Sequence, residues 1–189
     1  MDARTLHRAT VDRWQQLLDG VPDDAWAAPT PCAEWDVRAL VNHVVGEELW
    51  LPPLLAGRTI AEVGDRFDGD LLGADPKAAG RRAAGAAAEA GEGVADGQRV
   101  QLSYGEEAAS EYLMQLAADH LVHGWDLAAA SGQDRRLDPE LVDAVAAWFR
   151  DREDMYRAGN AIGPRATSAG DPQAELLAAF GRTADWSPG

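Results

Sequence analysis

Apolar side chains recur at the three- and four-residue spacing of amphipathic helices through most of the chain. This pattern predicts a series of long helices, and one short helix near the C-terminus, at residues 2–19, 37–55, 78–95, 106–130, 138–156 and 172–180. Local signals agree with these boundaries, because Asp36 is a favourable N-cap, Pro139 suits a first helical turn and Gly132 suits a C-terminal stop. The chain is therefore predicted to be all-α.

The longest connection lies between the second and third predicted helices, at residues 57–76, where acidic residues and glycines predominate. The stretch at 97–106 alternates too briefly to predict more than an extended linker. This helix count with one long crossover is typical of four-helix bundles. We therefore predict a four-helix bundle with extra C-terminal helices. It is expected to form a single domain over 1–189, with its core at about 1–157 and a loop and short helix at 158–189.

Charge and composition exclude several classes of partner. The 189-residue chain has 32 acidic and 17 basic residues, a formal net charge of −15 and no run of lysine or arginine, which disfavours nucleic acid and membrane surfaces. No apolar run reaches the length of a signal peptide or a membrane span, so a cytoplasmic location is expected. The single cysteine allows no intrachain disulfide. Alanine-rich helices bury little area each, which is compatible with a homodimer through a helix face.

A cluster of polar side chains interrupts the apolar pattern in "ADHLVHGWDLAAASG", residues 118–132. On a helix, residues three or four positions apart are neighbours, so His123 shares a face with Asp119 and also with His120. If this helix packs against the second predicted helix, His43 can approach from the opposite wall. Two imidazoles and a carboxylate suit a divalent transition metal, and three protein ligands leave a position open for water or a substrate atom.

Three neighbouring residues allow both a functional and a structural interpretation. His120 and Asp119 differ in angular position on their helix, so at most one of them is expected to be a ligand. Glu47 lies one turn beyond the histidine of the second helix and is either a fourth ligand, a general base or a solvated side chain. Asp126, one turn after His123, either holds the second ring nitrogen of a ligand or faces solvent.

Other residues are assigned structural roles. Cys32 lies in a proline-rich loop with nothing basic nearby in the sequence, so we expect a small apolar residue rather than a reactive thiol. His7 has no polar company at helical spacing and is expected at the surface. Trp35, Trp50 and Trp125 lie close in sequence to the candidate ligands and could line an apolar pocket, but we expect them in the core. The sequence has no Gly-x-Ser-x-Gly elbow and no matching phosphate loop, so the metal pocket is the remaining chemical interpretation.

The chain resembles the DinB-like superfamily of metal-binding proteins, and within it the branch of the N-terminal domain of mycothiol-dependent maleylpyruvate isomerase. Three segments carry the resemblance: "PTPCAEWDVRALVNHVVG" at 29–46, "DHLVHGWDLAAASG" at 119–132 and "DPQAELLAAFGR" at 171–182. Together these segments extend the resemblance over almost the whole chain. The tail segment points to a single-domain actinobacterial subgroup of this family.

The resemblance implies a four-helix bundle and a bound divalent metal, usually zinc or nickel. Carried over position by position, the ligands are His43, Asp119 and His123, which favours Asp119 over His120. Zinc is the first expectation, with nickel or iron as alternatives. The isomerase has glutamate where this chain has Asp119, a shorter acid that could loosen the site or leave room for His120 or water.

The resemblance also implies chemistry on a low-molecular-weight thiol and an electrophilic substrate, as in a mycothiol-type S-transferase or a thiol-dependent isomerase. The isomerase has a separate C-terminal domain that supplies part of its substrate pocket, and this chain has only about fifty residues beyond "AAASG". The isomerase activity itself therefore does not carry over. The alternatives are a non-catalytic, stress-related metal-binding bundle and a metal-assisted hydrolase in which Glu47 or His120 activates water.

Overall fold

The computed structural model describes residues 1–168 and 170–188. Its helices and strands run in the order α1 (Ala3–Asp19), α2 (Val37–Leu55), α3 (Ile60–Val63), α4 (Pro76–Glu92), β1 (Arg99–Leu102), β2 (Gly105–Ala108), α5 (Ala109–Ser131), α6 (Pro139–Phe149), α7 (Glu153–Ala158) and α8 (Pro172–Ala179). The helical fold class is confirmed, with one small antiparallel sheet added. Within the described residues, no helix is long and apolar enough to cross a membrane.

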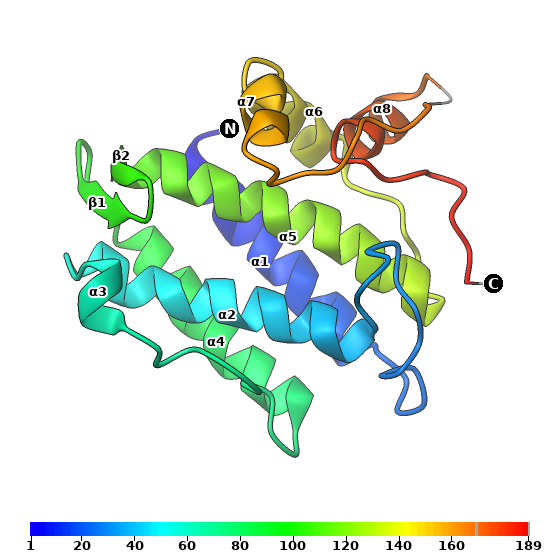
Figure 1. Ribbon diagram of the computed structural model, residues 1–189, viewed down its shortest axis with the longest axis horizontal. Coiled ribbons are helices and arrows are strands. Elements are labelled where there is room, and N and C mark those ends of the chain that lie inside the picture. The colour runs from blue at the N-terminus through cyan, green and yellow to red at the C-terminus, as the bar shows by residue number, and fades with distance from the viewer. Residues whose placement is uncertain (169, 189) are drawn as a thin grey trace.

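The helices α1, α2, α4 and α5 form a four-helix bundle (Figure 1). α1 packs against α5 and α4, and α2 packs against the same two helices. Between α2 and α4 the chain crosses over through residues 56–75, which include the short α3. The predicted bundle with its long crossover is therefore confirmed. α6, α7 and α8 lie together on the side of α5 away from α2 and α4 (Figure 1).

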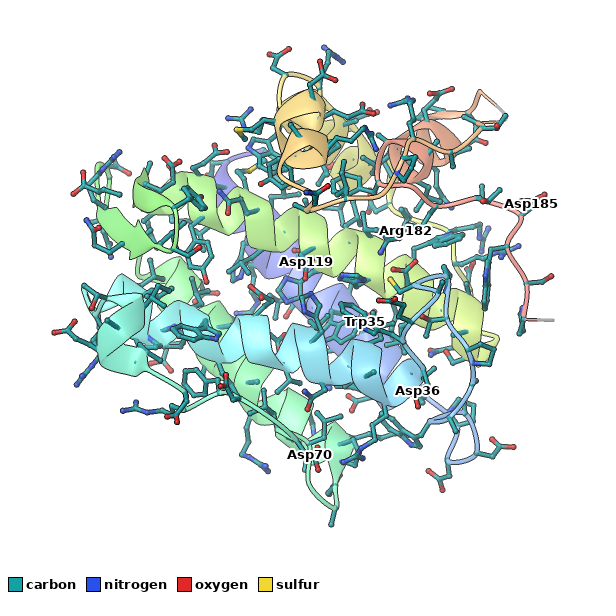
Figure 2. The ribbon with its side chains drawn as sticks, viewed as in Figure 1. Trp35, Asp36, Asp70, Asp119, Arg182 and Asp185 are labelled. Atoms are coloured by element: carbon teal, nitrogen blue, oxygen red, sulfur yellow. The ribbon has the colours of Figure 1, made fainter. Side chains whose placement is uncertain are left out.

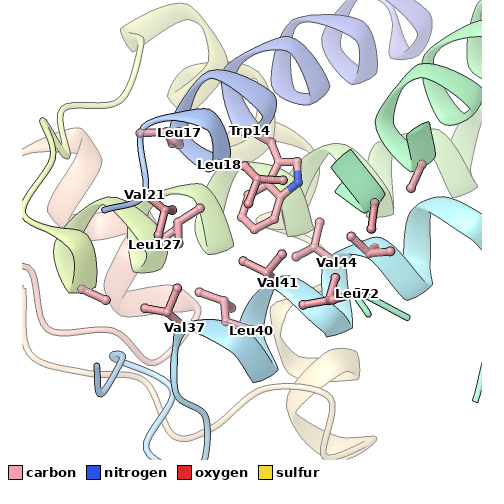
Figure 3. Close-up of a cluster of buried hydrophobic side chains, with 14 of the residues drawn as sticks. Trp14, Leu17, Leu18, Val21, Val37, Leu40, Val41, Val44, Leu72 and Leu127 are labelled. Atoms are coloured by element: carbon pink, nitrogen blue, oxygen red, sulfur yellow. The ribbon is translucent and has the colours of Figure 1, made fainter. Parts of the chain in front are cut away.

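Large apolar side chains fill the interior of the bundle (Figure 3). Trp14 and Leu18 of α1, Val41 and Val44 of α2 and Leu127 of α5 are fully buried in one cluster. Burial of each such side chain stabilises the fold by roughly 1.5–3 kcal/mol. α4 contributes mostly small buried residues, so its backbone approaches α1 and α2 closely. This core holds α2 and α5 side by side, and these two helices carry the predicted site.

Aspartates begin several helices, including the one that carries His43. A carboxylate accepts a hydrogen bond from a first-turn backbone N–H at five helix starts, which are Asp2, Asp36, Asp75, Asp138 and Asp171. Such caps satisfy N–H groups that have no partner within the helix. The cap at Asp36 fixes the start of α2, so His43 follows two turns later. α5 ends at Gly132, which has a left-handed φ of 72° that favours glycine.

The prediction of a linker at residues 97–106 is wrong. β1 and β2 form a hairpin in which Arg99 pairs with Ala108 and Leu102 with Gly105. The backbone of Gly105 has a φ of 133°, which only glycine adopts readily, so the tight connection depends on this residue. The second strand takes the place of the first residues predicted for the following helix, and α5 begins at Ala109. Strands of four residues are too short for their periodicity to be distinguished from a linker.

The prediction of one continuous helix at 138–156 is also wrong. The chain turns after Phe149, where the N–H of Arg152 donates to the Phe149 carbonyl at 2.8 Å, and α7 follows as a separate helix. Phe149 stacks on Phe180 with ring centroids 4.0 Å apart. This contact with the segment after α8 anchors the end of α6, so the chain turns there instead of continuing along the same axis. The short C-terminal helix is confirmed as α8.

Candidate metal centre

Three side chains from α2 and α5 converge between these helices. His43 Nε2 lies 3.5 Å from Asp119 Oδ2, and His123 Nε2 lies 3.3 Å from Asp119 Oδ1. The rings of His43 and His123 meet edge to face with their centroids 5.1 Å apart. One possible donor atom from each side chain lies within 4.8 Å of the other two. His43, Asp119 and His123 are called the triad below.

The triad fits a divalent metal ion. Asp119 Oδ2 is buried and has no hydrogen-bond partner among the described residues, although an imidazole nitrogen lies 3.5 Å away. Donor atoms at ~2.0–2.1 Å from a tetrahedral ion are about 3.3–3.4 Å apart, close to the 3.5 and 3.3 Å separations seen here. The side chains of His43 and Asp119 are each 29% exposed, so the triad can be reached from the surface. Metal binding by these residues stays a prediction.

The charges of the triad support one another. Burial alone would raise the pKa of Asp119, but His123 and His43 outweigh it and hold that pKa well below its usual range. Burial alone would lower the pKa of His123, whereas Asp119 and a hydrogen bond to Asp126 raise it well above its usual range. The triad therefore holds a carboxylate against a positive charge, and a divalent ion can take the place of the histidine proton.

Asp126 lies behind His123 and is fully buried. It accepts a hydrogen bond from His123 Nδ1 at 2.9 Å, so Nε2 is the ring nitrogen that faces the triad. Arg182, which follows α8, donates from Nη2 to Asp126 Oδ2 at 2.8 Å. Burial alone would raise the pKa of Asp126, but His123 and Arg182 lower it below its usual value. Of the two roles considered for Asp126, the structure shows the one in which it holds a histidine ring.

We expected Cys32 to behave as a small apolar residue because no basic residue lies near it in the sequence, but the fold brings a basic side chain to it. Arg182 Nη2 donates to Cys32 Sγ at 2.9 Å, and the same sulfur lies 3.4 Å from Asp126 Oδ2 and 4.0 Å from His123 Nδ1. Cys32, His123 and Asp126 thus form a second group of ligand-type atoms. Because the Arg182 guanidinium already supplies the cation at this group, we do not assign a metal to it. No local pattern indicates this contact, since the two partners are 150 positions apart in the sequence.

His120 does not belong to the triad. Its Nδ1 lies 2.7 Å from the Leu116 carbonyl, and its Nε2 lies 3.2 Å from Glu48 Oε1, deep in the bundle. Both side chains of the His120–Glu48 pair are almost fully buried. The prediction of a surface position for His7 is wrong, because His7 is buried against His120 with ring centroids 5.8 Å apart. Its buried partners come from other helices, so helical spacing within α1 could not reveal them.

A pocket of about 910 Å³ opens over the triad. Trp35 lines it and packs over both imidazoles, with ring centroids 4.7 Å from His43 and 5.8 Å from His123. Figure 2 shows Trp35, Asp119 and Arg182 near one another, although they come from distant parts of the chain. Of the other two tryptophans assigned to the core, Trp125 is buried there and Trp50 lines a separate hollow.

Glu47 also lines this pocket, one turn after His43 on α2. It is outside the group of atoms that lie within ligand distance of one another in the triad. Burial raises the pKa of Glu47, and the nearby Asp119 carboxylate raises it further. A carboxyl group shifted in this direction exchanges its proton at a pH closer to neutrality. Its position suits a proton acceptor beside the triad better than a fourth ligand.

The opposite wall of the pocket comes from the segment after α5. Trp148 of α6, Tyr156 of α7, Ile162, Phe180 and Arg182 all line the cavity. The sequence patterns did not indicate this role, because these residues are scattered through short helices and loops. The tail segment "DPQAELLAAFGR" ends on Arg182 and was the one sequence signal in this region.

The bundle and its histidine–carboxylate cluster define a helical protein with a ligand set of the kind that binds divalent metals. The chain belongs to the mycothiol maleylpyruvate isomerase N-terminal domain family, whose model matches residues 7–128. Two uncharacterized proteins of Mycobacterium tuberculosis are similar to it: MT0763 of strain CDC 1551 / Oshkosh and Rv0738 of strain ATCC 25618 / H37Rv. Each is 34% identical over 179 residues, which cover 93% of this chain and 87% of the relative. No solved structure gives a significant match.

Proposed function

We propose that this protein binds a divalent metal ion through His43, Asp119 and His123. We further propose that it is an enzyme that joins the sulfur of a low-molecular-weight thiol to an electrophilic substrate. The observation that carries the proposal is the unpartnered Oδ2 of Asp119, held beside His43 under an open pocket of about 910 Å³. Zinc is the first choice for this donor set, with nickel or iron as alternatives.

The family supports the choice of thiol, because its description names mycothiol. When bound, a divalent ion supplies the positive charge that holds a thiol sulfur as thiolate near neutral pH. In this proposal Glu47, which lines the same pocket, accepts the proton that leaves the thiol. The sulfur then forms a bond to the electrophilic carbon of the second substrate, and the leaving group departs with the electron pair of the broken bond. A thiol-dependent isomerase would instead add the thiolate to a carbon–carbon double bond without loss of a leaving group, allow rotation about the resulting single bond, and then eliminate the thiolate as the double bond forms again.

Three neighbouring residues orient and cover the side chains of the triad. Asp126 fixes the ring of His123, Arg182 balances the buried Asp126 charge, and Trp35 covers both imidazoles. A metal-assisted hydrolase is the second candidate, favoured by the position of Glu47, which could equally accept a proton from water. His120 does not support that alternative, because it is buried against Glu48.

Metal content tests the site. Purified wild type is expected to hold about one divalent ion per chain, and His43→Ala, Asp119→Ala and His123→Ala are expected to lose it. His120→Gln is the matched control, since it changes a neighbouring histidine of α5 that faces away from the triad. Circular dichroism identifies variants that remain folded. Retention of metal by folded triad variants, or its loss from folded His120→Gln, would overturn the assignment.

Turnover tests the chemistry. Mycothiol conjugation to 1-chloro-2,4-dinitrobenzene is followed with metal-loaded protein, with chelated protein and with Glu47→Gln. We expect conjugation that the chelator abolishes and that the Glu47 variant slows. Metal binding without chelator-sensitive conjugation to any thiol would indicate a binding protein. Hydrolysis of an activated ester by the same preparation, again sensitive to the chelator, would favour the hydrolase.

A further inference from the structure

The wall of the pocket that faces the triad is aromatic and held in place. Trp148 Nε1 donates to Glu111 Oε1 at 2.9 Å, and the Arg152 guanidinium donates to both oxygens of the same carboxylate at 2.7 and 3.0 Å. Arg152 also lies over the Trp148 ring, 5.0 Å from its centroid. Tyr156 meets the Trp148 ring edge to face with centroids 6.0 Å apart. The polar N–H of Trp148 is thus already bonded, and the wall offers mainly ring surface to a ligand.

Apart from the ion proposed for the triad, the described residues that line the pocket offer no free cation. Among the described residues that line it, Arg182 is the one lysine or arginine. Its guanidinium already donates to the Asp126 carboxylate at 2.8 Å, to the Phe180 carbonyl at 2.7 Å and to Cys32 Sγ at 2.9 Å. The charge of Arg182 is therefore balanced by a fully buried carboxylate. A ligand that carries a carboxylate would have to break this arrangement, or take the position of the thiol sulfur on the proposed metal ion, to obtain an ion pair.

The same pocket contains carboxylates that would oppose an anion. Glu34 and Glu47 both line it, on the side of the loop before α2 and of α2 itself. Two unit charges of like sign repel by about 1 kcal/mol at 4 Å in water, and by more where water is excluded. The chain as a whole has a net charge of −15, which adds to the repulsion of anions.

We infer that the second substrate of this site is an uncharged, largely aromatic electrophile, and that the pocket discriminates against carboxylates. The maleylpyruvate of the family's name is a dicarboxylate, so this chain is expected to act on a different class of molecule. The electrophilic character of this substrate rests on the proposed function, whereas the preference for uncharged rings rests on the pocket alone. A volume of about 910 Å³ has room for a thiol and a ring-bearing molecule together.

A pair of unreactive probes that differ by one carboxylate tests the inference without any thiol. Isothermal titration calorimetry compares 1,3-dinitrobenzene with 3,5-dinitrobenzoate on wild-type protein treated with a chelator, so that the benzoate cannot bind through a metal ion. We expect the uncharged probe to bind at least tenfold more tightly. Equal or tighter binding of the benzoate, or no binding of the uncharged probe, would overturn the inference. The outcome does not depend on thiol chemistry. The proposed function can therefore fail while this preference holds, and the preference can fail while the proposed function holds.

Two variants assign the preference to named residues. The double variant Glu34→Gln/Glu47→Gln is expected to reduce the preference for the uncharged probe about fivefold. Glu89→Gln makes the same kind of charge change at an exposed position on α4, and is expected to leave the preference unchanged. Ile162→Arg adds a cation to the loop that lines the pocket, and is expected to tighten benzoate binding at least tenfold. An unchanged preference in folded forms of both pocket variants would contradict the assignment.

Discussion

Asp126 accepts a hydrogen bond from Nδ1 of His123 at 2.9 Å, and the two residues lie three positions apart on α5. The bond orients the imidazole, so its Nε2 faces Asp119 and the centre of the triad, where a metal ion could take the place of the proton on this nitrogen. Histidine ligands of metals usually have such a partner on their second nitrogen. The partner residue of the candidate centre is thus built into the same helix as two of its ligands.

Replacement of Asp126 is expected to weaken metal binding without removing a ligand. In Asp126→Asn the ring of His123 loses a charged acceptor, and we expect the dissociation constant to rise roughly 10- to 100-fold. Competition with a chromophoric chelator measures this constant. Asp134→Asn, an exposed substitution just after α5, is the control and should leave the constant unchanged. An unaltered constant in folded Asp126→Asn would show that His123 does not depend on this contact.

Arg182 is expected to matter for stability as well as for the pocket. Its side chain is 14% exposed, whereas that of Asp126 is fully buried, so Arg182→Gln leaves a buried carboxylate with one fewer charged partner. We expect the free energy of unfolding to fall by about 3 kcal/mol, as measured in urea. Arg136→Gln removes an arginine from an exposed pair with Asp134 and should have little effect. Equal losses in the two variants would contradict this view of Arg182.

Local patterns predicted the bundle because the interactions that define it are local or repeated, and helical spacing together with the family resemblance predicted the three residues of the triad. Helical spacing places Asp119 and His123 on one face, and the Asp36 cap with helical periodicity places His43 on the neighbouring helix. The contacts of Arg182 with residues 56 and 150 positions away have no such local signature. They depend on how the segment after α5 folds back over the pocket, which the positions of its apolar residues do not determine.

The lack of a local signal also explains why the buried position of His7 on α1 was not predicted. His7 occupies a position that α4 makes possible, because Gly91 has no side chain at the point of closest approach. A Cβ atom added at Gly91 would lie 2.6 Å from His7 Nδ1. The sequence shows only a glycine in an alanine-rich helix, where glycine is ordinarily unfavourable. The requirement for glycine at this position becomes visible only when the two helices are packed together.

This close approach gives a matched pair of substitutions in one helix. Gly91→Ala should destabilise the protein by roughly 1–3 kcal/mol, because the new methyl group overlaps the buried imidazole. Gly85→Ala, with nothing within 4 Å of its added Cβ, should instead stabilise it by up to about 1 kcal/mol through helix propensity. Urea unfolding of the two variants measures both changes. An increase in the free energy of unfolding for both alanine variants would show that α1 and α4 lie farther apart than in this structure.

Acid sensitivity is the last expectation, and it follows from the burial of His7. Burial, with a smaller contribution from neighbouring His120, which is itself paired with Glu48, lowers the pKa of His7 to about 3. The unfolded chain binds a proton at this residue below about pH 6.5, whereas the folded chain does not until about pH 3. The contribution of His7 to stability is therefore complete above pH 6.5 and is lost as the pH falls towards 3.

His7→Leu removes this titration while keeping a buried side chain of similar size. Between pH 7.5 and pH 5, wild type should lose about 2 kcal/mol more of its unfolding free energy than the variant does. Urea unfolding at both pH values gives the four free energies that the comparison needs. Thr10→Val is the control, because it changes a buried polar residue of α1 that does not titrate. Identical pH dependence of wild type and His7→Leu would mean that His7 is protonated in the folded protein as readily as in water.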